Sequence, residues 1–240
     1  MIYVIGIGPG NFEGLTVEAL NALKECEIIS GYERYIELVK NFLPEKIFEV
    51  YPMRSEIKRC EDALKLSKEG RKIALISSGD SGVYGMAGLI LEISKGTDEN
   101  IKIIPGVTAA NSAASILGAP LMNDYVNISL SDLLTDWEII EKRLKAACKG
   151  DFVICIYNPA SHHRPENFKK ACGILLKYKS PETICGYVKN INREGQEFEI
   201  MTLEKIKDCE KIDMLCTVII GNSQSYILDG KMITPRGYKI

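Results

Sequence analysis

The residues with the clearest capacity for chemistry lie in the stretch SSGDSGVYGM (77–86), which directly follows a short apolar run. Its glycines at 79, 82 and 85 allow backbone conformations and close approaches that other residues resist. Asp80 stands among them and offers a carboxylate to ligand hydroxyl or amino groups, or to the first backbone N–H groups of a following helix. The stretch therefore predicts either a ligand-binding loop or a capped turn.

Two further glycine-bearing loops, GIGPGN (6–11) and PGVTAA (105–110), also follow apolar runs. The first lacks the third glycine of a dinucleotide fingerprint, where Asn11 stands, and Pro9 has no N–H for a phosphate, so a tight turn and a ligand site both fit. Thr108 either caps the next helix or contacts a ligand. Loops at the carboxyl ends of parallel strands form binding crevices, and this lining suits a flat, mostly neutral cofactor.

Alternation of β-branched runs with amphipathic segments predicts an α/β fold in which the first half carries a mostly parallel sheet. Strands are expected at 2–7, 71–77 and 101–106, and helices at 16–24, 55–68, 86–94 and 109–117.

The second half has more closely spaced strands, which favours a mixed sheet. Strands are expected at 126–130, 151–157, 183–188, 198–203 and 216–223, and helices at 136–148 and 165–178. Breaker residues in GAPLMND (118–124) indicate a boundary. We therefore expect an N-terminal α/β domain at 1–118, a linker at 119–125 and a C-terminal α/β domain at 126–240.

Composition excludes several classes. The 240 residues carry a net charge of −2, with 46% hydrophobic and 26% charged residues, which is typical of a globular protein without a nucleic-acid-binding surface. Eight cysteines show no Cys-x-x-Cys spacing, so we expect buried free thiols and no metal site. No signal-peptide pattern and no apolar run of about 18 residues appears, which predicts a cytoplasmic protein without a membrane span.

Several motifs together resemble one family. YVIGIGPGN, SSGDSGVYGMA and IIPGVTAANSAAS are similar to the loops of the tetrapyrrole (corrin/porphyrin) methylases. NISLSDLLTDWEIIEKRLKAA (127–147), FVICIYNPASHHR (152–164), TVIIGNSQSY (217–226) and MITPRGY (232–238) resemble the branch that methylates C17 of precorrin-3B or cobalt-factor III and contracts the ring in cobalamin biosynthesis. The resemblance covers nearly the whole chain. Ser81 stands where the family usually carries proline, which predicts a looser turn.

The resemblance implies S-adenosyl-L-methionine as cofactor, held in a ligand cleft between two α/β domains. Carried over position by position, the cofactor contacts are Pro9, Gly79, Asp80, Val83, Thr108, Ala109, Asn158 and Asn190. The implied substrate is a tetrapyrrole rich in carboxylates, with Arg54, Arg164 and Arg236 as candidate partners. Whether that substrate already carries cobalt stays open, and the resemblance also implies a homodimer.

Methyl transfer needs alignment more than a strong base, whereas ring contraction needs proton transfer. The candidates for these catalytic roles are Asp80, Ser129, Asp132 and His162. Asp132 alternatively caps a helix, and His162 alternatively belongs to a solvated loop.

Three rival functions share part of this pattern. A diphthine synthase or a ribosomal RNA methyltransferase has the same first three loops, but SLSDLLT and GNSQSY argue against both. A nucleotide-binding oxidoreductase would need the missing fingerprint glycine. A scaffold protein would leave the glycine loops without a purpose.

Overall fold

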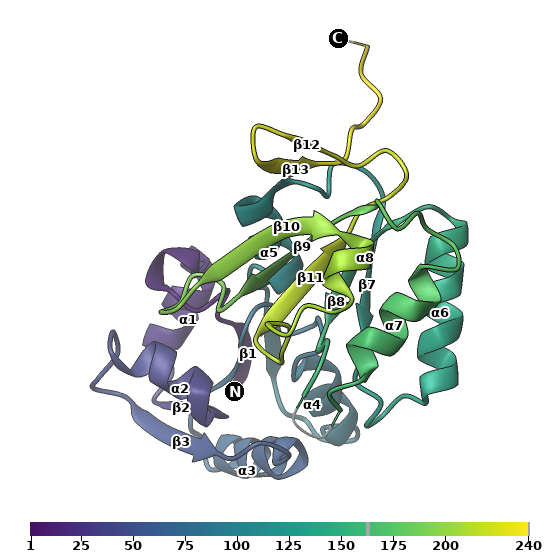
Figure 1. Cartoon of the computed structure of the whole chain (residues 1–240). Coiled ribbons are helices and arrows are strands. Elements are labelled where there is room, and N and C mark those ends of the chain that lie inside the picture. Colours follow the sequence, from purple (N-terminus) through teal and green to yellow (C-terminus); the bar gives the residue numbers. More distant parts are fainter. Residues whose placement is uncertain (162–163, 240) are drawn as a thin grey trace. The chain divides into compact units, whose positions relative to one another are not determined.

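The computed structural model of the chain describes residues 1–161 and 164–239 (Figure 1). The chain divides into two compact units, Met1–Ala109 and Ala110–Ile240. The sequence pattern instead places residues 110–118 in the first domain. Helix α5 (Ala109–Leu117) packs on the second sheet, because a Cβ on Gly186 would lie only 2.8 Å from Cδ2 of Leu117.

The first unit contains a sheet of order β3-β2-β4-β1-β5, in which every pairing is parallel. This agrees with the predicted parallel α/β architecture. The strands are β1 (Ile2–Gly6), β2 (Ile28–Tyr32), β3 (Ile47–Tyr51), β4 (Ile73–Ser77) and β5 (Ile101–Ile104).

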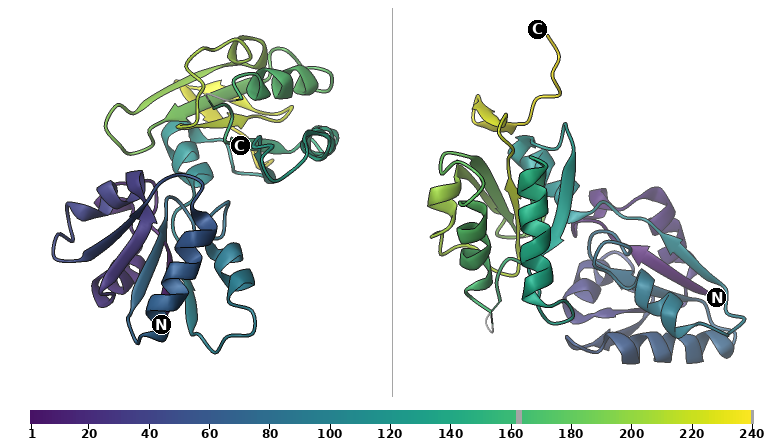
Figure 2. Two further views of the ribbon diagram at one scale, coloured as in Figure 1. Left: turned by 90° about the horizontal axis from the view of Figure 1, so that it is seen from below. Right: turned by 90° about the vertical axis from the view of Figure 1, so that its right-hand side faces the viewer.

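Helices cover both faces of this sheet (Figure 2, left). Side chains alternate along β1, so Tyr3 and Ile5 pack with α1 (Val17–Glu25) and α2 (Glu33–Lys40). Ile2 and Val4 instead pack with α3 (Glu56–Lys68) and α4 (Ala87–Ile93). A short 3₁₀ helix, η1 (Phe12–Gly14), follows the first loop. The loops at the carboxyl ends of these strands are therefore anchored by strands that are packed on both faces.

The sequence pattern does not predict β2, α2 and β3. Strand β2 contains Ser30 and Gly31, which are typical of turns. Strand β3 lies at the sheet edge and leaves Ile47 and Val50 exposed, so it lacks a simple buried alternation. Strand β2 forms because it pairs with β4, and β3 forms because it pairs with β2, both in parallel. Pairing between separate segments cannot be recognised from a short stretch of sequence.

The second unit contains a sheet of order β10-β9-β11-β8-β7, in which only β7 and β8 pair in parallel. The prediction of a mixed sheet is confirmed. The strands are β7 (Tyr125–Ser129), β8 (Val153–Tyr157), β9 (Ile184–Lys189), β10 (Glu197–Thr202) and β11 (Cys216–Ile220).

Helices α6 (Trp137–Lys149), α7 (Asn167–Leu175) and α8 (Leu203–Ile206) bury their apolar residues in one cluster with this sheet. A small sheet of β6 (Gly118–Ala119), β12 (Tyr226–Leu228) and β13 (Lys231–Ile233) completes the unit. It was not predicted, and β6 spans the expected end of the first domain, at Gly118, and the first residue of the expected linker, Ala119.

The eight cysteines all fall in the described ranges, are free, and are buried except for Cys209. This confirms the expected buried thiols, and burial raises the pKa of Cys60 to about 11. Across residues 1–161 and 164–239, no helix has the length and apolar character needed to cross a bilayer.

Candidate functional site

The first two glycine loops are joined at the carboxyl edge of the first sheet. Gly8 donates its N–H to the carbonyl oxygen of Gly79 at 3.0 Å, and Gly79 donates to that of Gly8 at 2.7 Å. Both residues have positive φ angles, 69° and 68°, which glycine adopts without a Cβ penalty. The two loops therefore meet through their backbones.

Asp80 joins the second loop to the third. Its Oδ1 accepts the N–H of Gly82 at 2.8 Å, and its Oδ2 accepts the N–H of Gly106 at 3.0 Å. Helix α4 begins at Ala87 with Met86 as its N-cap, so the capping alternative for Asp80 does not apply to this helix. Asp80 acts as a latch between the loops, and each carboxylate oxygen keeps a second lone pair.

Two glycines are needed because backbones touch at this edge. A Cβ on Gly106 would lie 2.2 Å from the carbonyl oxygen of Gly79 and 2.6 Å from that of Gly6. A Cβ on Gly6 would lie 2.6 Å from the N of Gly106. These glycines therefore serve contact between loops rather than contact with a ligand.

Ser81 does not loosen its turn, contrary to the expectation from the missing proline. Its side chain is fully buried, and its hydroxyl lies 3.3 Å from the carbonyl oxygen of Val4 and 3.4 Å from that of Ile104. The hydroxyl ties the turn to two strands, which replaces the restraint of a proline ring.

The other predicted contacts of the first unit gather around this edge. A Cβ built on Gly79 would meet Ala109 N at 3.5 Å and Thr108 Cα at 3.7 Å, which is ordinary contact. Val83 follows in the second loop, and its N–H donates to the carbonyl oxygen of Asp80 at 3.4 Å. Pro9 is buried in the first loop, next to the Gly8–Gly79 bridge.

Tyr84 is a feature of the second loop that residue patterns did not single out as a site. It is 55% exposed and has a φ of 55°, which is uncommon for a residue with a large side chain. No sequence signal marks a non-glycine residue with positive φ. Its place beside Val83 makes Tyr84 a candidate lining residue.

Polar residues also follow two strands at one edge of the second sheet. Strand β11 runs antiparallel to both β8 and β9, so β8 and β9 share a direction. Asn158 and Asn190 follow these strands with φ angles of 50° and 49°. Asn158 donates from Nδ2 to Ser129 Oγ at 2.9 Å, and Asn190 donates from Nδ2 to the carbonyl oxygen of Gly195 at 3.4 Å.

Arg164 organises a network beside Ser129. Its guanidinium donates to Ser131 Oγ at 2.9 Å, to Asp132 Oδ1 at 3.2 Å and to Ser161 Oγ at 3.2 Å. Burial acts to raise the pKa of Asp132, but hydrogen bonds from Arg164, the backbone and Asn167 outweigh it and hold that pKa below its ordinary value. Asp132 is therefore a weak base at neutral pH, and it positions Arg164.

We expect Arg164→Met to raise the pKa of Asp132 and to lower the free energy of unfolding at pH 7 by about 1–2 kcal/mol. Because the pKa of Asp132 is lower in the folded protein than in the unfolded chain, its carboxylate stabilises the fold at pH values above the unfolded pKa. This stabilisation is lost as the pH falls through the folded pKa. The difference in the free energy of unfolding between Arg164→Met and the wild type should therefore become smaller below about pH 4.

Carboxyl NMR titration and denaturant unfolding across pH test this expectation. Arg143→Met, an exposed arginine of α6, is the matched control and should change neither quantity. An unchanged Asp132 pKa in Arg164→Met would contradict the network.

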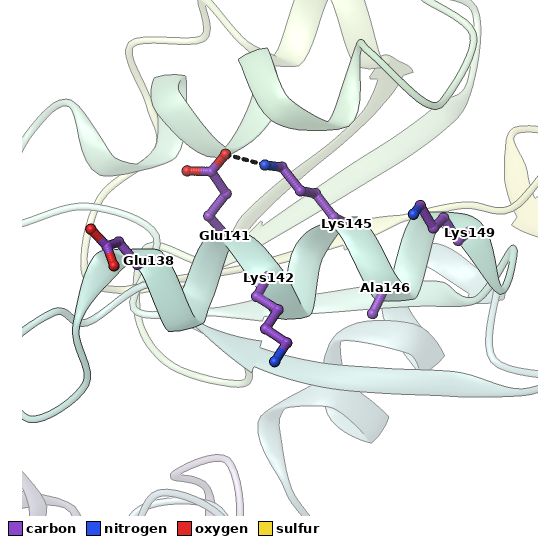
Figure 3. A pocket seen from close by; sticks show the side chains of 6 residues that line it. All are labelled: Glu138, Glu141, Lys142, Lys145, Ala146 and Lys149. Carbon is purple, nitrogen blue, oxygen red and sulfur yellow. Dashed lines mark ion pairs between the residues drawn. The ribbon is translucent and has the colours of Figure 1, made fainter.

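The remaining predicted residues lie outside these clusters. Arg54 is exposed between β3 and α3, and Arg236 is exposed after β13. His162 lies outside the described residues. A surface hollow on α6 is lined by charged side chains of that one helix, including the Glu141–Lys145 pair at 2.6 Å (Figure 3). It contains none of the predicted site residues.

Known proteins resemble the chain throughout. The family model described as Tetrapyrrole (Corrin/Porphyrin) Methylases matches residues 1–207. A Salmonella typhimurium protein named probable cobalt-factor III C(17)-methyltransferase is 49% identical over 242 aligned residues, which cover 100% of both chains. A Sinorhizobium sp protein named precorrin-3B C(17)-methyltransferase is 35% identical, with 99% of this chain and 96% of the relative covered.

The fold is similar as well. The crystal structure of the methyltransferase CobJ superimposes with a TM-score of 0.90 at 34% identity, and the match covers 98% of this chain and 99% of that one. The two predicted α/β sheets, the three joined loops and the similarity along the whole chain lead to one conclusion. The chain belongs to the tetrapyrrole (corrin/porphyrin) methylase family.

Proposed function

We propose that this protein transfers a methyl group from S-adenosyl-L-methionine to C17 of cobalt-factor III and contracts the macrocycle, in cobalamin biosynthesis. The observation that carries the proposal is the 49% identity, over the full length of both chains, to the relative named for this reaction. Identity falls to 35% for the relative named for metal-free precorrin-3B, which favours the cobalt-bearing substrate. Family membership sets aside the oxidoreductase and scaffold rivals.

The lining of the first unit fits this cofactor. A Cβ added at Gly79 would come no closer than 3.5 Å to another atom, Ala109 N, so this side of the Gly79 backbone is not in close contact with the neighbouring loop. Asp80 is the acidic member of the proposed contact set and suits the hydroxyl and amino groups of the cofactor. The proposed contacts are Pro9, Gly79, Asp80, Val83, Thr108, Ala109, Asn158 and Asn190.

When bound, S-adenosyl-L-methionine supplies a methyl group on a positively charged sulfur, so the chain needs to supply mainly orientation. The latch through Asp80 fixes two loops before any ligand arrives, which limits the freedom lost on binding. No strong base is required for methyl transfer itself.

Ring contraction requires proton transfer, for which Ser129 is better placed than Asp132. Ser129 Oγ accepts hydrogen bonds from Asn158 Nδ2 at 2.9 Å and from Ser131 N at 3.2 Å. Its own hydroxyl proton can then be donated to substrate. Asp132 is engaged by Arg164 and its pKa is lowered, so it would hold a proton poorly at neutral pH. Asp80 remains a proposed catalytic residue through its positioning of the loops.

The carboxylates of the substrate require cations. Arg54 and Arg236 are exposed, whereas Arg164 already pairs with Asp132 at 3.2 Å. We propose that Arg54 and Arg236 bind the substrate carboxylates directly. Arg164 would bind a substrate carboxylate only while its guanidinium also stays bonded to Asp132. We also propose that the protein is cytoplasmic and that it forms a homodimer. Light scattering of the purified protein would test the homodimer.

Anaerobic incubation of the protein with cobalt-factor III and methyl-deuterated S-adenosyl-L-methionine tests the function. We expect a product that gains one labelled methyl group, and slower turnover of precorrin-3B. Mass spectrometry reads the label, and S-adenosylhomocysteine added in excess should suppress transfer. Calorimetric binding of NAD without binding of S-adenosylhomocysteine, or transfer to RNA or a protein instead, would overturn the proposal.

A further inference from the structure

Arg59 is a buried arginine of α3 without a carboxylate partner. It is 3% exposed, and its Nε has no hydrogen-bond partner. Among the described residues no aspartate or glutamate lies within 4.0 Å of its guanidinium, although Lys58 of the same turn pairs with Asp62 at 3.0 Å. Buried cations in proteins are usually paired, because an unpaired charge is costly to remove from water. The missing partner therefore needs an explanation.

The contacts of Arg59 place it at the carboxyl edge of the first sheet. Its guanidinium carbon lies 5.8 Å from the ring centroid of Tyr51, the last residue of β3. The hydroxyl of Tyr51 donates to Asp62 Oδ2 at 2.9 Å, and the raised pKa of Tyr51 keeps this phenol neutral, so it does not balance the charge of the arginine. Because the sheet is parallel, this edge is the one that carries the glycine loops.

A second buried polar group shares this face. Ser30 pairs with Glu49 across β2 and β3, and Tyr32 pairs with Tyr51. Side chains alternate along a strand, and Ile28 packs with residues of α3, so Ser30 and Tyr51 lie on the α3 face. Ser30 is 2% exposed, and its hydroxyl has no hydrogen-bond partner in the described structure. Two unsatisfied polar groups thus occur on one face of the sheet, which also carries the half-buried carboxylate of Glu49 opposite Ser30.

The start of α3 adds positive potential. The helix begins at Glu56, and its N-cap Ser55 makes no side-chain capping bond. Uncapped N–H groups at a helix start attract anions. Arg54, exposed directly before the helix, has no ion pair among the described residues. Glu56 in the first turn opposes this potential, and its carboxylate favours the charged form of Arg59 through space without an ion pair within 4.0 Å.

We propose that Arg59, Ser30 and the start of α3 form a binding site for a carboxylate group. This inference rests on the proposed function in one respect, because the acetate and propionate arms of a tetrapyrrole are one source of that group. A free small carboxylate is the other source. A guanidinium binds carboxylate through two parallel N–H bonds, and the Ser30 hydroxyl would donate a third. Such a partner would resolve both unsatisfied groups.

Thermal unfolding with sodium acetate as the probe tests the site without any enzymatic assay. We expect acetate at about 100 times its dissociation constant to raise the midpoint of the wild type by roughly 5–10 °C. Arg59→Met should not show this rise. In buffer without carboxylate its midpoint should equal or exceed that of the wild type, because an apolar side chain replaces an unpaired buried charge. Arg143→Met should respond to acetate as the wild type does.

Comparing the affinities of the wild type and Arg59→Met for cobalt-factor III distinguishes a substrate arm from a free carboxylate. A tenfold weaker affinity in Arg59→Met, with affinity for S-adenosylhomocysteine unchanged, identifies a substrate arm. A response to acetate with unchanged substrate affinity identifies a free carboxylate. Failure of the wild type to methylate would overturn the proposed function but not the response to acetate.

Equal responses to acetate in the wild type and in Arg59→Met, or no response in either, would overturn the carboxylate site. A lowered midpoint of Arg59→Met in buffer without carboxylate would also overturn it, because that result assigns Arg59 to packing on Tyr51. Should Arg59→Met fail to fold, Ser30→Ala replaces it. That variant removes one donor and should reduce the rise caused by acetate, and an undiminished rise would again contradict the site.

Discussion

Gly106→Ala should lower the free energy of unfolding by about 3 kcal/mol and the thermal midpoint by roughly 6–12 °C. The new Cβ would lie 2.2 Å from the carbonyl oxygen of Gly79 and 2.6 Å from the carbonyl carbon of Gly6. Both are backbone atoms of loops tied to buried strands, so no flexible side chain can move aside. Separating the loops should also abolish measurable binding of S-adenosylhomocysteine. Differential scanning calorimetry and titration calorimetry measure the two effects.

Gly88→Ala is the matched control for this variant. Gly88 lies in the same unit on α4, and among the described residues no atom outside its own helix and chain neighbours comes within 4 Å of an added Cβ. Alanine is favoured over glycine inside a helix by about 0.5–1 kcal/mol, so the control should be slightly stabilised and should bind the cofactor normally. A Gly106→Ala protein as stable as Gly88→Ala would show that the loops do not touch as described.

Asp80→Asn should weaken binding of S-adenosylhomocysteine by about tenfold and lower the free energy of unfolding by about 1.5 kcal/mol. An asparagine keeps one carbonyl oxygen, so it can accept from Gly82 or from Gly106 but not from both. Its amide group would then face the other N–H donor. Losing the latch releases the third loop, and titration calorimetry with urea unfolding measures both consequences.

The two measurements on Asp80→Asn separate the possible roles of the carboxylate. Reduced affinity together with reduced stability supports a latch, whereas reduced affinity alone indicates direct contact with the cofactor. Asp98→Asn, in an exposed loop of the same unit, is the control and should change neither. A wild-type result for both quantities in Asp80→Asn would remove Asp80 from the site.

Most strands and helices of the second unit could be predicted from the local pattern of apolar residues, whereas fewer of those in the first unit could. The runs DFVICIY and CTVII are apolar and β-branched, and both form buried strands, β8 and β11. Strand β2 was not predicted because Ser30 and Gly31 interrupt its apolar run. Only its pairing with β3 and β4 compensates for these residues.

The glycine loops and their place after strands could be read from the sequence, because glycine and proline limit the backbone locally wherever they occur. The partners of polar side chains could not. Asp80 accepts from Gly106, 26 residues away, and Arg164 donates to Asp132, 32 residues away. Residue order therefore determined the family, the α/β class and which loops face the sheet edge. Tertiary structure alone decided which donors are satisfied and which stay unpaired, because burial and hydrogen bonding depend on distances between segments that are remote along the chain.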